Sequence, residues 1–497
     1  MTPEMDCEVL VVGAGPAGLT TALSLAAQGV SVRIVDDMPA RHATARASVI
    51  HARTLELLAP FGVADRLAAY AQPLREVRFY DSAGDEILRR QPQAVDSQYP
   101  PVQNLQQWHT EWILAEQLLA RGVDVQPGTR FTGLSQQGDL VVATLETAGG
   151  TVSVRCRYLV GADGARSAVR KACATRMVGT DYPERWIAGE LTIEHERVNT
   201  EGRVLFGADR TALSFPLDAA LLFFATLREG EFPDARPGPA DPAQVLEVYN
   251  ATFGAHPALR SRVVGVPWTG HFRMHSCCVP DYRIGRVFLA GDAAHLVSAA
   301  GGFGMNAGIQ DGINLAWRLA AHLRLNADAS ILDGYNVDRR EMFETFAAVS
   351  DSTHRLFVGR DAAALRDNAE LRSAAVMAAA VSRARHTYVD WVTANANYTG
   401  REMESAPRVI ASGRLGWTPT RGTFVQAEWT HLGSYWLEAG NSPLFGRYPG
   451  HDLLNLRASH AVTAIVAASI SSTTAYITRR SRNWKLSSPG FKGIRMP

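Results

Sequence analysis

The residues best suited to chemistry near the N-terminus are three glycines and an aspartate. Gly13, Gly15 and Gly18 follow a buried apolar run and open an Ala/Leu-rich helix, and a second apolar run ends at Asp36. This order predicts a βαβ unit in which Gly13 allows a tight turn, Gly15 lets the backbone approach a pyrophosphate and Gly18 packs helix against strand. Asp36 is then placed to accept a hydrogen bond from a ribose hydroxyl. We therefore predict dinucleotide binding, against the alternative of a merely tight turn.

A second turn of small residues follows the strand expected at 158–160. It contains Asp163 and Gly164, and a helix is expected to open at Ser167. A turn of this kind, with a buried acid at the carboxyl end of a strand, suits a ligand crevice in an α/β sheet.

A third motif joins an expected strand at 287–290 to an expected long helix at 305–319. Asp292 follows the strand and is placed to accept a hydrogen bond from a ribityl hydroxyl. The start of the helix, with free N–H groups and partial positive charge, can face the flavin edge where negative charge gathers on reduction. The residues expected around the cofactor here are Asp292, Gly301, Gly302, Gly304, Met305 and Asn306. Three motifs in this order favour FAD over NAD.

Length and composition limit the classes of protein to which the chain can belong. Its 497 residues predict two or three domains, and 50 Lys+Arg against 49 Asp+Glu give no electrostatic signature of a nucleic-acid or membrane-surface partner. The five cysteines lack metal spacing, so we predict no metal site and reduced thiols in a cytoplasmic protein. Neither a signal peptide nor a stable membrane insertion is expected.

Around these motifs the chain resembles the single-component flavin-dependent aromatic hydroxylases of the para-hydroxybenzoate hydroxylase and phenol hydroxylase type. The run R-A-x-x-x-H-x-R-T-L-E at 46–56 follows the first βαβ unit as it does in that family. The resemblance, which covers roughly residues 5–380, implies that Arg46 lies against FAD and that Gln107 touches the flavin. For Gln107 the alternative is a helix-start glutamine that bonds only to the backbone. The resemblance also implies that FAD and NAD(P)H both approach the turn at Asp163.

The same resemblance implies an activity. FAD, reduced by NADPH or NADH, would react with O2 to a C4a-hydroperoxide and hydroxylate a phenolic or polyketide-type aromatic substrate. The alternatives are an FAD epoxidase or dehydrogenase of the same fold, or a catalytically impaired flavin-binding fusion protein. The catalytic base is not identified, since His271 and His275 are each candidates but can equally be structural. We expect a monomer or a homodimer.

One loop departs from the family pattern. Family members commonly carry a proline before the glycine pair, whereas this chain has Ser298, Ala299 and Ala300. The rigidity of the loop beside the flavin ring is therefore an open question.

The fold class expected is α/β, a Rossmann-like FAD-binding domain with an inserted antiparallel substrate sheet and an atypical β-rich C-terminal segment. The expected parts are an FAD-binding domain (1–75, 102–178 and 272–385), a substrate-binding sheet (76–101 and 179–271), a β-rich segment (386–462) and a poorly ordered tail (463–497).

Three runs in the β-rich segment alternate with a period of two, at 411–417, 425–430 and 454–459. They resemble late strands of a TonB-dependent receptor barrel. Because three strands cannot close a barrel or pair their own edges, we expect a fused or scrambled fragment instead of a membrane anchor.

Overall fold

The computed structural model describes most of residues 5–359 and separate strands beyond them. The described ranges are 5–40, 47–92, 97–194, 200–359, 410–417, 423–432, 435–436, 447–448, 451–460, 472–480 and 483–487. Contacts between residues divide the chain into two units, residues 1–325 with 329–384, and residues 326–328 with 385–497.

The first unit is built on a sheet in which β1 is central. Its strand order is β17-β18-β11-β1-β2-β8, with β10 and β9 extending from β11 as an antiparallel hairpin. The bounds are β1 Cys7–Val12, β2 Val32–Val35, β8 Val125–Gln126, β9 Arg130–Gln137, β10 Leu140–Thr147, β11 Gly150–Gly161, β17 Arg283–Ile284 and β18 Val287–Leu289. β1 pairs in parallel with both β2 and β11. Parallel strands covered on both faces need apolar residues at nearly every position, and Val9, Leu10 and Val11 are fully buried.

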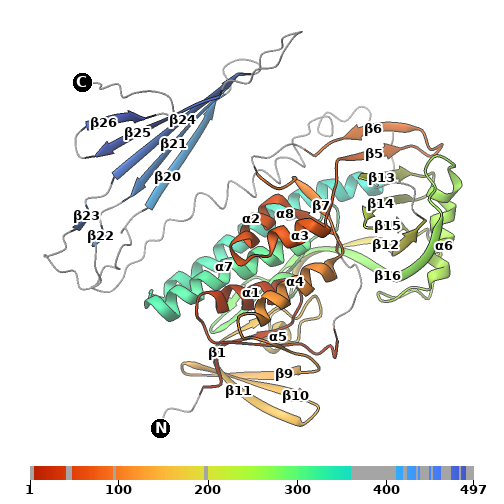
Figure 1. Cartoon of the computed structure of the whole chain (residues 1–497). Helices are drawn as coiled ribbons and strands as arrows, with labels where there is room; N and C mark the ends of the chain where they lie inside the picture. Colours follow the sequence, from red (N-terminus) through yellow and green to blue (C-terminus); the bar gives the residue numbers. More distant parts are fainter. Residues whose placement is uncertain are drawn as a thin grey trace. The chain divides into compact units, whose positions relative to one another are not determined.

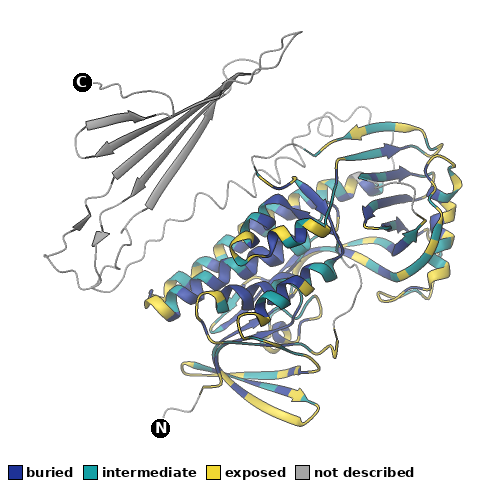
Figure 2. Ribbon diagram, viewed as in Figure 1, coloured by how far each residue is buried: buried dark blue, intermediate teal, exposed yellow. Residues whose placement is uncertain are grey.

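Helices cover this sheet. α1 Pro16–Ala27 packs against α7 Phe303–Leu325 and α4 Gln107–Leu119 (Figure 1). Figure 2 shows the helix sides that face the core as buried and their outer sides as intermediate or exposed. The other helices of this unit are α2 Ala52–Leu58, η1 Ala59–Phe61, α3 Ala64–Tyr70, α5 Ala168–Ala172, α6 Pro242–Ala251, η2 Phe253–Ala255, η3 Gly291–Ala293, η4 Ala329–Leu332 and α8 Asp333–Gly359.

A second sheet of eight strands carries the order β19-β16-β12-β15-β14-β13-β5-β6. The bounds are β5 Glu76–Tyr80, β6 Glu86–Arg90, β12 Val178–Ile193, β13 Glu201–Phe206, β14 Thr211–Leu217, β15 Ala220–Thr226, β16 Val263–Cys278 and β19 His295–Leu296. A small sheet of β3 Val49–His51, β7 Val102–Asn104 and β4 Gln72–Pro73 also belongs to this unit. The expectation of an antiparallel inserted sheet needs one correction, because β5 and β13 pair in parallel.

The two faces of the second sheet are both apolar but serve different cores. Ile187 and Leu205 pack with Val245 of α6, whereas their neighbours Trp186 and Val204 belong to the opposite face. This alternation follows from the period of two along a strand. The face opposite α6 is therefore free to form the wall of a cavity.

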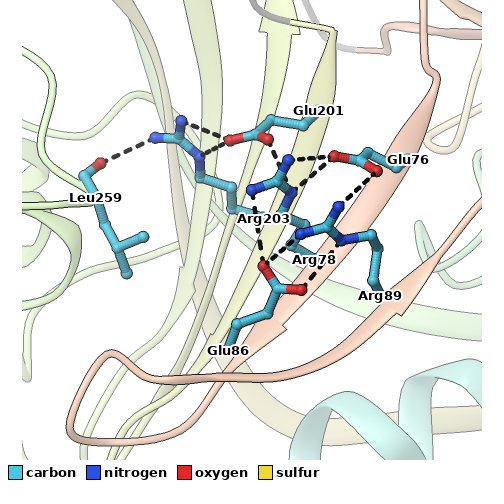
Figure 3. A network of polar contacts seen from close by, with 7 residues as sticks. All are labelled: Glu76, Arg78, Glu86, Arg89, Glu201, Arg203 and Leu259. Atoms are coloured by element: carbon cyan, nitrogen blue, oxygen red, sulfur yellow. Dashed lines mark hydrogen bonds and ion pairs between the residues drawn. The ribbon is translucent and has the colours of Figure 1, made fainter.

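Charges replace apolar residues where the sheet reaches its edge. Arg78, Arg89 and Arg203 interleave with Glu76, Glu86 and Glu201 on β5, β6 and β13 (Figure 3). The Arg78 Nε lies 3.0 Å from the Glu201 carboxylate, and Arg203 Nη1 donates to the Leu259 carbonyl at 3.0 Å. Because these side chains are partly exposed, each pair contributes little stability, but charged side chains at an edge oppose edge-to-edge association.

The second unit contains a five-stranded antiparallel sheet with order β20-β21-β24-β25-β26. The strands are β20 Ile410–Trp417, β21 Thr423–Leu432, β24 His451–His460, β25 Ser472–Arg480 and β26 Asn483–Ser487, with β22 Tyr435–Trp436 paired to β23 Arg447–Tyr448. β20, β21 and β24 coincide with the three alternating runs. β25 and β26 lie within residues 463–497, for which the sequence predicts a poorly ordered tail. β25 pairs with the edge that β24 would otherwise leave open.

None of the helices in the described residues combines the length and the hydropathy that a membrane span requires.

Candidate active site

The glycines of the first motif have different steric surroundings. Gly13 has a φ of +105°, and a Cβ there would lie 2.3 Å from the Ala162 carbonyl oxygen. A Cβ on Gly18 would lie 1.9 Å from the Gly13 carbonyl oxygen, whereas no atom of the described residues would lie within 4 Å of a Cβ on Gly15. The protein itself thus excludes side chains at Gly13 and Gly18. Space stays open at Gly15, where α1 begins.

The start of α1 leaves backbone donors available. Within the part of the chain that the structure describes, no side chain caps it, and Pro16 occupies the first turn, where its missing N–H costs no bond. Asp36 Oδ2 accepts from the Ala14 N–H at 2.6 Å, and Oδ1 accepts from the Met38 N–H at 2.9 Å. Asp36 therefore orders the glycine turn and also lines the cavity described below.

The second turn is organised by a helix cap. Asp163 accepts from the Ala168 N–H at 2.6 Å and from the Ser167 hydroxyl, so its carboxylate caps α5. The neighbouring Arg170, a buried residue in the helix that the second motif predicts, donates to the Ala293 carbonyl at 2.9 Å. Arg170 thereby ties this turn to the turn that carries Asp292. Asp163 and Gly164 both line the cavity.

A buried ionic group holds the third motif. Asp311 on α7 accepts from the Gly291 N–H at 2.8 Å and from His295 Nε2 at 2.7 Å, and it pairs with Arg339 of α8. Burial alone would raise the pKa of Asp311, but the charges of Arg339 and His295 and the hydrogen bonds outweigh it and lower that pKa. The turn of η3 is thus fixed with Asp292 exposed toward the cavity. The sequence signal for Asp311 is an acid within an otherwise Gly/Ala/Leu-rich helix.

Asn306 lies behind the cavity wall. Its Oδ1 accepts from the His51 N–H at 2.9 Å and the Thr54 hydroxyl at 2.7 Å, and its Nδ2 donates to the Val49 and Gly302 carbonyls. These four bonds use the full capacity of an amide side chain. Asn306 and Gly18, both expected at the cofactor, do not line the cavity, so they support the residues that line it without facing it themselves.

The glycine pair before α7 packs against β3. Gly302 has a φ of +66°, and a Cβ there would lie 2.4 Å from the Cβ of Val49. Gly301, Gly302, Gly304 and Met305 all line the cavity. His51 is buried beside this loop, its ring packs edge-on against Phe303, and burial lowers its pKa to about 4.

Gln107 begins α4 and also lines the cavity. Its N–H donates to the Ala47 carbonyl at 3.1 Å, and its Nε2 donates to Glu111 at 2.7 Å. Arg46 lies outside the described residues.

These residues share one cavity of about 1520 Å³ with the second sheet. The far wall is aromatic and aliphatic, and it is formed by Phe79, Trp186, Leu213, Phe215, Phe224, Trp268, Phe272 and Met274. α8 closes part of it with Ser352, Thr353 and Arg355. The arrangement joins a glycine-lined cradle to an apolar chamber.

The two candidate bases occupy different places. His271 lines the cavity, its backbone pairs with Gly238, and its Nε2 lies 2.9 Å from Gln244 Oε1. Burial, with a contribution from Arg185, lowers the pKa of His271, while its Nδ1 is buried without a partner among the described residues. His275 does not line the cavity, and it bonds to Asp181 at 2.6 Å.

A family model described as FAD binding domain matches residues 6–350. The chain belongs to this FAD-binding family. Among its relatives is 6-methylpretetramide 4-monooxygenase of Streptomyces rimosus, 34% identical over 361 residues, a match that covers 68% of this chain. The chain spans only 60% of that relative's length.

Solved structures of FAD-family enzymes share the fold. Aklavinone-11 hydroxylase, in complex with FAD and aklavinone, superposes with a TM-score of 0.64 at 28% identity over 73% of this chain and 71% of its own. The p-nitrophenol 4-monooxygenase of Pseudomonas putida DLL-E4 superposes with a TM-score of 0.66 at 26% identity. The match covers 77% of this chain and 98% of that enzyme's chain. The predicted α/β fold with an FAD-binding domain is therefore confirmed.

The residues of this FAD-binding domain fit the cofactor. Open space beside Gly15 and the uncapped start of α1 suit a pyrophosphate. Asp292, Gly301 and Gly302 line the same cavity as the aromatic wall.

Proposed function

We propose that the protein is an FAD-dependent monooxygenase that hydroxylates an aromatic substrate at the expense of NADPH or NADH. The observation that carries this proposal is the single cavity, which the three cofactor motifs and an aromatic sheet face line together. Hydroxylation consumes one O2 and one reduced nicotinamide, adds one oxygen atom to the substrate and releases the other as water. Unpaired thiols at all five cysteines support the expected cytoplasmic location.

The volume of the cavity supports a bulky substrate. A site of about 1520 Å³ exceeds the roughly 300–1,000 Å³ of a typical single-ligand pocket, so it has room for a dinucleotide and a second ligand. Aromatic rings on the wall can stack on a flat ring system. Relatives named for 6-methylpretetramide, aklavinone and p-nitrophenol support a phenolic or polyketide-type aromatic substrate.

The chain's own groups would bind and shelter the reactants. Backbone donors at α1 and the acids Asp36 and Asp292 would hold the dinucleotide, and the start of α7 would face the flavin ring. When bound, FAD would supply the redox chemistry, accepting a hydride from NAD(P)H and activating O2 as a C4a-hydroperoxide. The apolar wall would exclude water from the reacting ring.

Substrate-dependent NAD(P)H oxidation tests the proposal. The FAD-loaded protein is mixed anaerobically with NADPH or NADH, with and without phenols that range from one ring to four fused rings, and flavin reduction is followed by absorbance. We expect slow reduction alone and at least tenfold faster reduction with fused-ring phenols. Equal rates with and without every phenol would contradict a substrate-gated hydroxylase and favour an oxidase or an impaired flavoprotein.

A further inference from the structure

The loop that lacks the family's proline is held by a buried serine. Ser298 is fully buried, and its Oγ lies 3.3 Å from the Ala300 N–H, 3.2 Å from His354 Nδ1 and 3.1 Å from Met274 Sδ. The Ala300 N–H donates to this hydroxyl. One side chain therefore links the loop to β16 and to α8.

The directions of these hydrogen bonds follow from the contact that His354 makes with Glu184. His354 Nε2 lies 3.3 Å from the Glu184 carboxylate, which can only accept when ionised, so Nε2 carries a hydrogen. In a neutral imidazole Nδ1 is then the acceptor, and the Ser298 hydroxyl donates to it. The chain of bonds runs from Ser298 through His354 to Glu184.

His354 cannot easily move within this chain. Its ring packs at a tilt of 33° against Tyr182, with centroids 3.9 Å apart, and the centroid of the Trp186 ring lies 6.2 Å away. The Tyr182 hydroxyl donates to Asp351, one turn earlier on α8. Because Ser298 is fully buried, this serine, histidine and glutamate are not arranged for attack on a substrate.

The anchored residue immediately precedes the cofactor-facing part of the loop. Ala299, Ala300, Gly301 and Gly302 line the cavity, whereas Ser298 does not. Any change in the backbone at Ser298 is therefore passed directly to residues that border the flavin cradle.

We propose that Ser298 is a positioning residue which, with His354 and Glu184, substitutes for the missing proline and holds residues 299–302 in the conformation that receives FAD. The inference rests on FAD binding as part of the proposed function. It assigns to α8 a part in cofactor retention, through His354.

The test compares two buried serines. Ser298→Ala removes the anchor, and Ser350→Ala is the matched control, because Ser350 on α8 is fully buried and its hydroxyl has no partner among the described residues. Titration of apoprotein with FAD, followed by flavin fluorescence, should show a dissociation constant on the order of tenfold higher for Ser298→Ala, as loss of a buried hydrogen bond predicts. Ser350→Ala should match the wild type.

Hydrogen exchange supplies a readout that needs no flavin. In the apoprotein, a peptide spanning 296–303 should exchange faster in Ser298→Ala, while peptides from α1 and β1 stay unchanged. Faster exchange throughout the first unit would reduce Ser298 to a general stability role and overturn the proposal.

A double-mutant cycle tests the chain of bonds. If Ser298 acts through His354, the double variant with Ser298→Ala and His354→Phe should weaken FAD binding no more than the single variant that has the larger effect. Additive losses, or wild-type affinity in Ser298→Ala, would overturn this inference alone. A wild-type protein that binds no FAD would overturn the proposed function as well.

Discussion

Asp311, in the middle of α7, accepts a hydrogen bond of 2.8 Å from the Gly291 N–H, so a buried carboxylate fixes the turn that presents Asp292. His295 and Arg339 complete its surroundings and hold its pKa below the usual value. A carboxylate with a depressed pKa stabilises the folded state above the unfolded pKa, and that contribution is lost as the pH falls through the folded pKa.

Replacing Asp311 by Asn should destabilise the protein by about 3–5 kcal/mol near neutral pH, because Arg339 is left as a buried unpaired charge. The difference in unfolding free energy between variant and wild type should become smaller as the pH falls below about 4. Urea unfolding at several pH values measures both effects. Asp333→Asn is the control, since its pair with Arg283 is exposed and should contribute less than about 1 kcal/mol. A difference in unfolding free energy that does not change with pH would contradict an ionised Asp311.

Two glycines of the first motif should respond in opposite ways. Gly15→Val should leave the apoprotein folded, because the φ of Gly15 is −73° and none of the residues that the structure describes would lie within 4 Å of an added Cβ. It should nevertheless raise the FAD dissociation constant by about 100-fold by occupying the pyrophosphate space. Gly18→Ala should instead destabilise the fold by roughly 3 kcal/mol, because the added Cβ would clash with the Gly13 carbonyl oxygen. Thermal melts and FAD titrations separate the two. Normal FAD affinity in Gly15→Val would place the pyrophosphate elsewhere.

The buried His51 should give the protein an acid-sensitive step. Its pKa is about 4 when folded and about 6.5 when unfolded, so stability is retained above pH 6.5 and lost as the pH falls toward 4. The shift corresponds to about 3 kcal/mol. His51→Phe keeps a ring against Phe303 but cannot titrate, so its unfolding free energy should fall less between pH 6.5 and 4. If the unfolding free energies of His51→Phe and the wild type fall in parallel with pH, His51 is not buried in its neutral form.

The sequence could predict the features that depend on neighbouring residues. The glycine turns, Asp163 before α5 and the turn at Asp292 all follow from local order along the chain. The start of β12 depends on pairing with a distant strand, because β16 pairs with β12 back to Val178, well before the apolar run of the strand begins at Trp186.

Contacts between distant residues could not be predicted. Ser298 meets a histidine 56 positions away, and that histidine meets a glutamate 170 positions from it. The capping role of Asp163 and the four bonds of Asn306 also need the folded backbone. A sequence motif shows that such residues matter at the site but does not reveal which atoms they contact.

The division of the chain into two units predicts the outcome of a truncation. The first unit has its own core, and all the residues that line the proposed FAD site belong to it. A protein ending at Arg385 should therefore keep FAD with an unchanged dissociation constant and should be more soluble, because the strand edges of residues 410–487 are removed. Size-exclusion chromatography with absorbance at the flavin band measures both. Loss of flavin on truncation would make the C-terminal segment part of the site.

The central claim is that the cavity joins FAD to an aromatic substrate for oxygen transfer. The most direct measurement is mass spectrometry of the product formed by the FAD-loaded protein, NADPH or NADH and a fused-ring phenol under 18O2. An aromatic hydroxylase should form a product heavier by one 18O atom, in proportion to the nicotinamide consumed. Nicotinamide oxidation that yields only hydrogen peroxide, with no labelled product from any ring system, would contradict it.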